Sequence, residues 1–522
     1  MTKEYMELFL TELSTGFYIR QVLVIVGLFL LGFICLQICG EKMEQKWKYL
    51  LAFPMGLALW CVIGFLILTL GIPLSVVSIA IVMVSGMTIL FWSGHKERKT
   101  KEKADRPNGL WKPFLVVFCG VCVAACVATS GLSSFSVSND TMYYYLYYPE
   151  VLVSKGGYVA SFDTFLSDVG PMAALIGTLP ALFGFDQFYG IHQFFNFNFL
   201  LLFAIVIYEC ARMKLSQKTS VVTAVMGTAI LSVSTPYLVI SKWVLANAYI
   251  MYYSFILFYL AYKYSPTDDE IKEKSNWFPA VFFVLIGMIS MLRMEGCVVA
   301  CFIVICMSTL HYSNKQLVCA AMLPTLLFTV LYYIRYFLFL KMSPLYSFLT
   351  WQKAVLIICA MLILLSYLLL IRGKRFKKLQ SRMRLLLVLA MFLGNGILFL
   401  FAPSHYMVVI QAFCKNMSGR QGWGYTIELI VICYIMISVL SLILNGFRLQ
   451  HRDIDYEDFI FVGFLFVLFA VSYARGGGLR YGIGDSGNRV MMQIIPLAWY
   501  ALICKAIHLM KESNNANRSE CR

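Results

Sequence analysis

The chain has 522 residues, of which 60% are hydrophobic and only 13% are charged. Soluble proteins carry about 25% charged residues, so this composition excludes a water-soluble globular protein and requires that most of the surface faces lipid. Lys and Arg outnumber Asp and Glu by 43 to 27, a net charge of +16. This excess lies in short loops between apolar segments, as the positive-inside rule predicts, and does not indicate nucleic-acid binding. We expect an all-α, multi-pass protein of the cell membrane.

Apolar segments succeed one another along the chain, and a helix of roughly 20 residues crosses a bilayer. We expect spans at 22–39, 49–70, 72–92, 113–129, 189–210, 221–240, 244–262, 278–292, 296–310, 317–340, 354–371, 385–401, 426–445, 459–473 and 490–510. The prediction is a helical bundle of about 13–15 transmembrane helices. Residues 1–112 form N-terminal helices ahead of a core at 113–522.

Basic residues predict the orientation of the bundle. The loops at 96–112 and 372–384 each hold seven Lys and Arg residues, so both are expected in the cytoplasm. Counting spans from them places 133–170, 404–424 and 474–489 outside. This alternation requires that the apolar stretch 171–185 does not cross the membrane, and we predict a re-entrant or interfacial helix there.

The longest external segment, 133–170, holds an acid followed by a run of tyrosines. Asp140 precedes Tyr144, Tyr145 and three further tyrosines between positions 143 and 148. An interfacial aromatic belt explains the rings as well as a binding site does. A carboxylate near the bilayer, however, must be hydrated, paired or used, and its position suits a general base that takes a proton from an acceptor hydroxyl.

The order of motifs along the chain resembles that of the GT-C membrane glycosyltransferases. The matching positions are Asp140, Tyr144, Pro149, Gly156, Pro171, Phe183-Gly184, the polar break Met291–Gly296 and the stretch from Arg489 to Pro496. The chain is most similar to the branch of the protein mannosyltransferases and the aminoarabinose transferase of lipid A. The resemblance implies a GT-C-like bundle whose external first loop carries short interfacial helices. It also implies an enzyme that moves a sugar from a polyprenyl phosphate-linked donor to an acceptor at the outer face of a bacterial cytoplasmic membrane.

Three positions depart from that family pattern. Tyr145 stands where the branch often has His, and Asn247 stands where a membrane-embedded Asp is common. Asn139-Asp140 replaces a pair of carboxylates, and a divalent metal is not supported because hard cations are usually held by more than one carboxylate. Asp163 and Asp168 would have to supply the further ligands. The 16 cysteines lie mostly within apolar segments without zinc or disulfide spacing, so no metal site is predicted.

Arginines on the predicted outer side are candidates for binding the donor phosphate, because a guanidinium grips phosphate oxygens in a bidentate manner. They are Arg293, Arg475, Arg480 and Arg489, and Tyr144 and Tyr145 are candidate substrate contacts beside the catalytic candidate Asp140. For each arginine taken singly, a role as a headgroup anchor is the alternative. Arg335 lies one turn from the external end of its span and either snorkels or reaches the same cavity.

Other function classes remain open from the sequence. A transporter or flippase of a lipid-linked substrate predicts inverted repeats and charges deep in the membrane, neither of which the sequence shows. An O-antigen polymerase or ligase predicts a large external loop late in the chain, whereas here it is early. The sequence identifies neither the sugar nor the acceptor; membrane lipids are the other expected partners.

Overall fold

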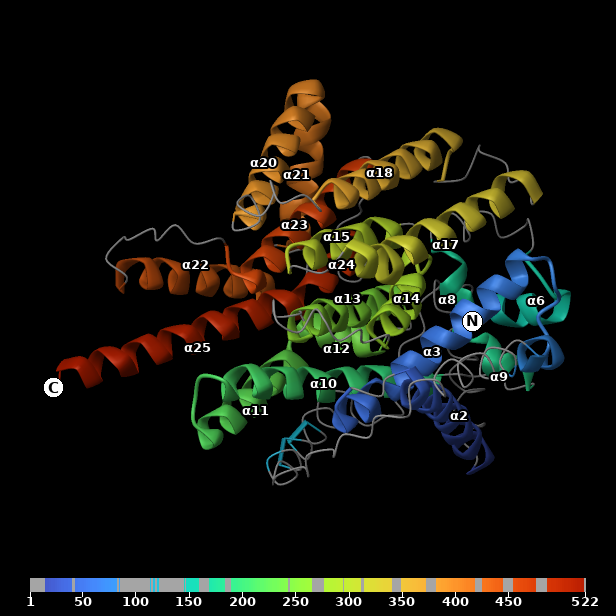
Figure 1. The fold of residues 1–522 in the computed structure, drawn as a ribbon, viewed down its shortest axis with the longest axis horizontal. Coiled ribbons are helices and arrows are strands. Elements are labelled where there is room, and N and C mark those ends of the chain that lie inside the picture. The colour runs from blue at the N-terminus through green and yellow to red at the C-terminus, as the bar shows by residue number, and fades with distance from the viewer. Residues whose placement is uncertain are drawn as a thin grey trace.

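The computed structural model describes residues 15–39, 43–81, 84, 113, 116–117, 120–121, 145, 147–158, 169–183, 189–242, 245–264, 277–293, 295–310, 314–339, 349–371, 382–417, 425–444, 454–475 and 486–520. Within these ranges the regular elements are all helices and there is no strand. The predicted all-α class is therefore confirmed. Figure 1 shows the helices gathered into one elongated bundle, with the short helices α6, α8 and α9 at one end and the C-terminus of the long helix α25 at the other.

The longer helices are α2 (Thr15–Cys39), α3 (Gln45–Thr69), α10 (Tyr189–Arg212), α11 (Gln217–Val233), α13 (Ala246–Lys263), α14 (Trp277–Ser290), α15 (Gly296–Ser308), α17 (Leu323–Ile334), α18 (Trp351–Leu370), α20 (Met383–Phe401), α21 (Pro403–Met417), α22 (Thr426–Leu444), α23 (Tyr456–Arg475) and α25 (Ile495–Glu520). The shorter ones are α6 (Tyr148–Lys155), α8 (Pro171–Leu175), α9 (Thr178–Leu182), α12 (Thr235–Lys242), α16 (Asn314–Leu317) and α24 (Ser486–Met491). Two π-helical turns, η4 (Val318–Met322) and η5 (Arg335–Phe339), flank α17, and the 3-10 turn η7 (Met492–Ile494) joins α24 to α25.

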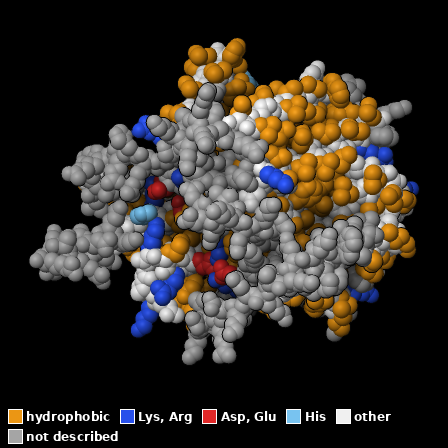
Figure 2. Space-filling model, in the orientation of Figure 1, with side chains coloured by type: hydrophobic (Ala, Val, Ile, Leu, Met, Phe, Trp, Pro, Cys, Tyr) orange, Lys and Arg blue, Asp and Glu red, His pale blue; other side chains and the backbone are white. Residues whose placement is uncertain are grey.

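Nine helices within the described ranges are long and apolar enough to cross a membrane. Hydrophobic side chains cover a large part of the described surface in Figure 2, as a lipid-facing protein requires. The chain is therefore a multi-pass membrane protein. Helices α14 and α15 are apolar but have only 14 and 13 residues, so each is shorter than the roughly 20 residues of an ordinary span.

The bundle has a buried centre and a lipid-exposed margin. Helix α13 is buried along most of its length, and Tyr249 and Tyr252 pack against the ring of Phe195 on α10 with centroid distances of 4.5 and 4.3 Å. By contrast, only 17%, 6% and 11% of the apolar segments of α18, α20 and α22 are buried inside the protein. Helices α18, α20 and α22 therefore form the margin, and the polar groups held around α13 are shielded from lipid.

The N-terminal hairpin is held by a close approach of two backbones. A Cβ atom added to Gly32 of α2 would lie 1.9 Å from the carbonyl oxygen of Ala52, and one added to Gly56 of α3 would lie 1.8 Å from that of Leu28. Small residues at such crossings let transmembrane helices pack without the hydrophobic effect. This contact fixes α3 against α2 along the side of the bundle.

The structure differs from the predicted elements in two places. The expected single span at 221–240 is divided into α11 and α12, with Ser234 in an extended conformation between them. Pro236 has no N–H group and cannot continue the hydrogen-bond ladder of α11. The expected external loop at 404–424 instead contains the helix α21. The short helix expected in the loop at 133–170 is present as α6.

The apolar stretch at 171–185 forms two short helices. Helices α8 and α9 have five residues each and could rise only about 8 Å apiece, far less than a bilayer. Thr178 accepts a hydrogen bond from the indole nitrogen of Trp60 at 3.0 Å, so α9 lies beside the interior of α3. Helices of this length agree with a stretch that does not cross the membrane, and its re-entrant or interfacial placement stays a prediction.

Candidate functional site

A tight turn between α14 and α15 presents the buried side chain of Arg293. The amide of Gly296 donates to the carbonyl of Arg293 at 2.9 Å, and a Cβ on Gly296 would lie 2.0 Å from the carbonyl oxygen of Ile289. Only glycine therefore fits this turn. The turn corresponds to the predicted polar break at Met291–Gly296, and its arginine is 9% exposed.

Glu295 and Asn247 both accept hydrogen bonds from the Arg293 side chain. Its Nε atom donates to Oε1 of Glu295 at 2.5 Å, and its Nη1 atom donates to Oδ1 of Asn247 at 2.9 Å. Glu295 is 4% exposed and Asn247 is fully buried at the start of α13. Burying a guanidinium requires such compensation, because an unpaired buried charge is costly. The pair is formally neutral, and its planar donor fork is fixed in direction.

Asn247 also carries the clearest unmet polar group of this cluster. Within the described residues, its side-chain Nδ2 atom is buried and has no hydrogen-bond partner. A buried amide donor left unpaired costs about 1–3 kcal/mol. Groups of this kind are kept where a bound water or ligand supplies the missing partner. The Nδ2 atom of Asn247 is therefore a candidate hydrogen-bond donor to a water or a polar ligand beside Arg293.

The end of the loop at 133–170, which is predicted to be external, docks directly on this turn. Gly170 has a positive φ of 84°, and a Cβ there would lie 2.5 Å from the carbonyl oxygen of Met291 and 3.2 Å from Arg293. The amide of Met172 donates to the same Met291 carbonyl at 3.1 Å. The Gly170-Pro171 pair is thus held against the arginine turn by backbone contacts that no other residue at position 170 would permit.

Tyr145 brings the beginning of the first loop to the same place. Its ring is 1% exposed, and its hydroxyl accepts a hydrogen bond of 2.7 Å from the backbone amide of Ala246, the residue before Asn247. Next to it, the hydroxyl of Tyr249 lies 3.4 Å from the Nδ1 atom of His192. The outer cluster, defined as Tyr145, Gly170, Asn247, Arg293 and Glu295, therefore joins three segments that are far apart in the sequence.

Two of the predicted site residues, Tyr145 and Arg293, thus meet around Asn247. Arg489 lies half-buried on α24, which leads into η7, and η7 packs against α13. Arg475 is the last residue of α23. Asp140, Tyr144 and Arg480 lie outside the described residues, as do Asp163 and Asp168.

Several other polar residues lie along the helices, outside the outer cluster. Asn196 and His192 share a buried face of α10, as their spacing predicts, and the Asn196 amide donates to the carbonyl of His192 at 3.0 Å. Glu428 lies in the first turn of α22, where an acid complements the helix dipole. His405 is placed 3.2 Å from the carbonyl oxygen of Tyr473, which fits a structural histidine.

Two members of the outer cluster receive no role from the sequence. Glu295 forms an ion pair with Arg293. Its position two residues after Arg293 in a short polar turn is the one feature of the sequence that could have predicted this pair. Gly170 is the contact point of the loop. Its place immediately before Pro171 is visible in the sequence, but a positive φ and the approach to Met291 can be seen only in the structure.

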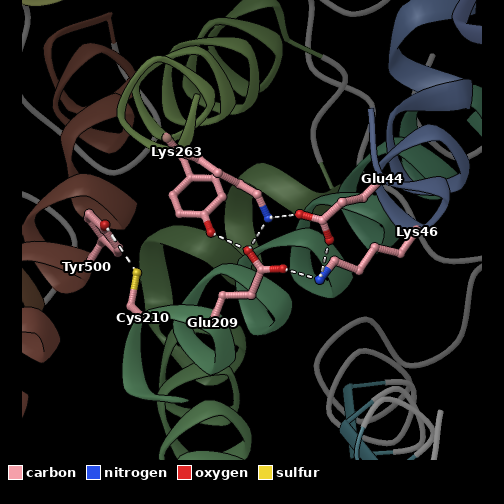
Figure 3. Close-up of polar contacts among 7 residues, drawn as sticks. Glu44, Lys46, Glu209, Cys210, Lys263 and Tyr500 are labelled. Atoms are coloured by element: carbon pink, nitrogen blue, oxygen red, sulfur yellow. Dashed lines mark hydrogen bonds and ion pairs between the residues drawn. The ribbon is translucent and has the colours of Figure 1, made fainter. Parts of the chain in front are cut away.

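A second charged cluster lies at the opposite ends of these helices, and we call it the inner network (Figure 3). Lys46 binds Glu44 at 2.8 Å and Glu209 at 2.6 Å, while Lys263 binds Glu44 at 2.9 Å and Glu209 at 2.7 Å. The Tyr259 hydroxyl also donates to Glu209 at 2.6 Å. These residues join the start of α3 to the C-terminal ends of α10 and α13.

The inner network is compensated in charge and mostly satisfied in hydrogen bonds. It contains two carboxylates and two ammonium groups, and the Lys263 ammonium also lies 4.7 Å from the centre of the Trp47 ring. Burial opposes ionisation of Glu44, but the hydrogen bonds and charges of Lys46 and Lys263 hold its pKa below the ordinary value. The arrangement indicates a structural clamp.

The described residues offer no ready metal site. No group of three or more His, Cys, Asp and Glu side chains within those ranges is arranged to hold a metal ion. The outer cluster contains a single carboxylate, which is already paired with Arg293. A guanidinium, an amide and a tyrosine hydroxyl can orient an anion or a hydroxyl-rich ligand by hydrogen bonds.

Comparison with known proteins was made at the level of families, curated sequences and solved structures. No family model, no curated protein and no solved structure matches the chain. The function is therefore inferred from the geometry of the outer cluster and from the motifs that meet there.

Proposed function

We propose that the protein is a glycosyltransferase that moves a sugar from a polyprenyl phosphate-linked donor to an acceptor at the outer face of the cytoplasmic membrane. One observation carries the proposal: the end of the first loop, at Gly170, is docked against the turn that presents Arg293. Both motifs belong to the resemblance with GT-C enzymes, and they are separated by more than a hundred residues. Their meeting supports a shared site.

The proposed chemistry needs a base on the acceptor and cations on the leaving phosphate. Asp140, which lies in the loop that ends at Gly170, takes the proton from the acceptor hydroxyl as that oxygen attacks the anomeric carbon. The bond from that carbon to the phosphate oxygen breaks, and negative charge develops on the phosphate. Arg293, with its direction fixed by Glu295 and Asn247, stabilises that charge together with Arg489.

Arg475 and Arg480, with Tyr144 and Tyr145, complete the proposed substrate contacts. Tyr145 also accepts a hydrogen bond from the amide of Ala246 and so holds the start of the loop against α13. The proposed donor would lie at the predicted outer end of the bundle, within reach of membrane lipids. The resemblance to GT-C enzymes also leads us to propose the bacterial cytoplasmic membrane as the location of the protein.

The proposal is tested by the lipid that accompanies the protein. Detergent-extracted protein should carry a polyprenyl phosphate or its sugar-linked form, identified by mass spectrometry, and Arg293→Gln should lose it. A transporter of another substrate would carry a different lipid or none, which would contradict the proposal.

The role of the base is tested separately with Asp140→Asn. This change keeps the shape of the side chain and removes its charge, so transfer should fall by about 10² to 10⁴ while lipid retention stays unchanged. Glu150→Gln is the matched control, because Glu150 is an exposed acid on α6 in the same loop. A parental transfer rate in Asp140→Asn would remove Asp140 from the mechanism.

A further inference from the structure

A further polar cluster, distinct from both the outer cluster and the inner network, lies at the predicted outer ends of α3 and α17. It comprises Thr69, Gly71, Tyr148, Tyr158, Tyr332 and Arg335. Arg335 is the first residue of the π-helical turn η5. Such turns are rare and are frequently found at functional sites.

Two glycine turns lie beside this cluster, and the first of them contacts the arginine. Gly71 ends the turn after α3 with a φ of 76°, and a Cβ there would lie 3.8 Å from Nη1 of Arg335. Gly156, with a φ of 67°, brings the chain after α6 against Pro73. These two turns place Tyr158, which comes after α6, beside the end of α3.

Tyr158 lies near this arginine, and Tyr148 and Tyr332 lie near Tyr158. Tyr158 interacts electrostatically with both Tyr148 and Arg335, and Tyr332 interacts with Tyr158 and Tyr148. Tyr148 is fully buried, Tyr332 is 3% exposed and Tyr158 is 8% exposed. Burial and the nearby Tyr148 raise the pKa of Tyr158 well above its usual value, so its hydroxyl stays protonated and able to donate.

Two hydroxyl groups of this cluster lack a hydrogen-bond partner within the described residues. They are the hydroxyls of Tyr158 and Thr69, and both are buried. Thr69 and Arg335 are themselves only partly buried, so the cluster extends from an accessible edge to the Tyr158 hydroxyl inside. A hydroxyl without a hydrogen-bond partner and a partly exposed guanidinium are groups that can pair with the hydroxyls of a hydroxyl-rich ligand.

We infer that this cluster binds the acceptor and that the acceptor is a glycan or polyol, whose hydroxyls pair with Tyr158, Thr69 and Arg335. The inference rests on the proposed transferase function. The helix α6, which supplies Tyr148, packs against α8 and α9, and α8 begins directly after Gly170. The first loop therefore lies between the donor cluster at Arg293 and this further cluster, as a loop carrying the base between two substrates requires.

The decisive variant is Tyr158→Phe, which removes only the unmet hydroxyl. Because that hydroxyl has no protein partner among the described residues, its loss should leave thermal stability unchanged or slightly higher. Tyr237→Phe is the matched control, since the Tyr237 hydroxyl donates to the carbonyl of Asn196 at 2.8 Å and its loss should lower stability without affecting the acceptor. Arg335→Gln is the second variant.

The measurement uses protein purified with its own lipid-linked sugar, to which protease-treated envelope glycan from the source cells is added. Tyr158→Phe and Arg335→Gln should retain the donor lipid as the parent does. Consumption of that lipid at low glycan concentration should fall about tenfold, because the loss of one hydrogen bond weakens glycan binding by about that factor. Consumption should recover in part at high glycan concentration.

The outcomes separate the two proposals. Parental consumption in both variants would overturn the acceptor site, and so would recovery of the sugar on protein hydroxyls in place of glycan. If the parent carries no polyprenyl phosphate-linked sugar, the proposed function fails and the acceptor site fails with it. Loss of donor lipid in Tyr158→Phe would overturn the acceptor site by reassigning the cluster to the donor.

Discussion

The outer cluster and the inner network both hold charged groups at helix ends of the same bundle, but they are built differently. In the inner network, Lys46 and Lys263 each reach both Glu44 and Glu209, so every charge has two partners of opposite sign. In the outer cluster, Arg293 pairs with Glu295, and the neighbouring amide donor of Asn247 lacks a partner within the described residues.

This difference in construction indicates a difference in role. Redundant pairing tolerates the loss of one member and suits a clamp that joins α3, α10 and α13. In the outer cluster, the buried amide donor of Asn247 leaves a hydrogen bond that a ligand or a water can complete. The two clusters therefore predict opposite responses to substitution: the inner network should affect stability alone, and the outer cluster should affect ligand retention as well.

The largest effect is expected for Glu295→Gln. It leaves the Arg293 guanidinium in a buried position without its carboxylate, and breaking a buried pair in this way typically costs about 3–5 kcal/mol. Equilibrium unfolding in mixed detergent micelles measures this loss. An unchanged free energy of unfolding would show that the pair is not buried as described.

The double variant Arg293→Met with Glu295→Met is the control for that experiment. Replacing a buried ion pair with apolar side chains is often neutral or stabilising, so stability should return toward the parental value. The double variant should not retain polyprenyl phosphate, because it lacks the Arg293 guanidinium. Recovery of both properties would mean that the pair serves the fold and not the ligand.

Asn247→Leu should have the next largest effect on the outer cluster. It removes the acceptor of the Arg293 Nη1 bond, worth about 1.5–3 kcal/mol for a bond to a charged group, and also removes the unmet donor. We expect reduced stability and reduced lipid retention. Normal lipid retention would show that the unmet donor is only a packing defect.

Much of this architecture can be predicted from the sequence, and the reason is physical. Apolar length and the distribution of Lys and Arg predict an alternation in which Asn247 and Arg293 lie at outer ends while Lys46 and Lys263 lie at inner ends. In the structure, Arg293 binds Asn247 at one end of the bundle. At the other end, Lys46 and Lys263 both bind Glu44. The same alternation of charges requires a non-crossing stretch at 171–185, and the two short helices found there agree with it.

Other features depend on contacts that one-dimensional patterns do not contain. Glu209 lies in an apolar stretch whose polar partners come from α3 and α13, so its role depends on the packing of three helices. The division of 221–240 depends on a single proline whose effect is local. The docking of Gly170 on Met291 depends on a positive φ, and glycine in a sequence does not reveal which of its allowed conformations it adopts.

A smaller effect is expected for Glu209→Gln in the inner network. Gln keeps the shape but loses the charge shared by Lys46, Lys263 and the Tyr259 hydroxyl, while Glu44 still compensates both lysines. The expected cost is about 1.5 kcal/mol, the lower end for hydrogen bonds to charged groups. Unfolding measures it, and lipid retention should equal that of the parent. Loss of the lipid would contradict the assignment as a clamp.

The smallest effect concerns pH and Glu44. Its pKa is lowered in the folded protein by Lys46 and Lys263, so the folded state favours the ionised form more than the unfolded state does. The resulting stabilisation is fully present above the unfolded pKa of about 4.3 and is lost as the pH falls through the lower folded value. Glu44 is nearly half exposed, at 47%, so the effect is small and weakens with added salt.

The measurement is the apparent unfolding temperature of the parent and of Glu44→Gln between neutral pH and pH 3. The variant should start slightly lower at neutral pH, and the two curves should converge as Glu44 is protonated in the parent. Raising the salt concentration at neutral pH should narrow the gap in the same way. A gap that stays constant with pH would show that Glu44 acts through packing and not through its charge, and the inner network would then rest on Glu209 alone.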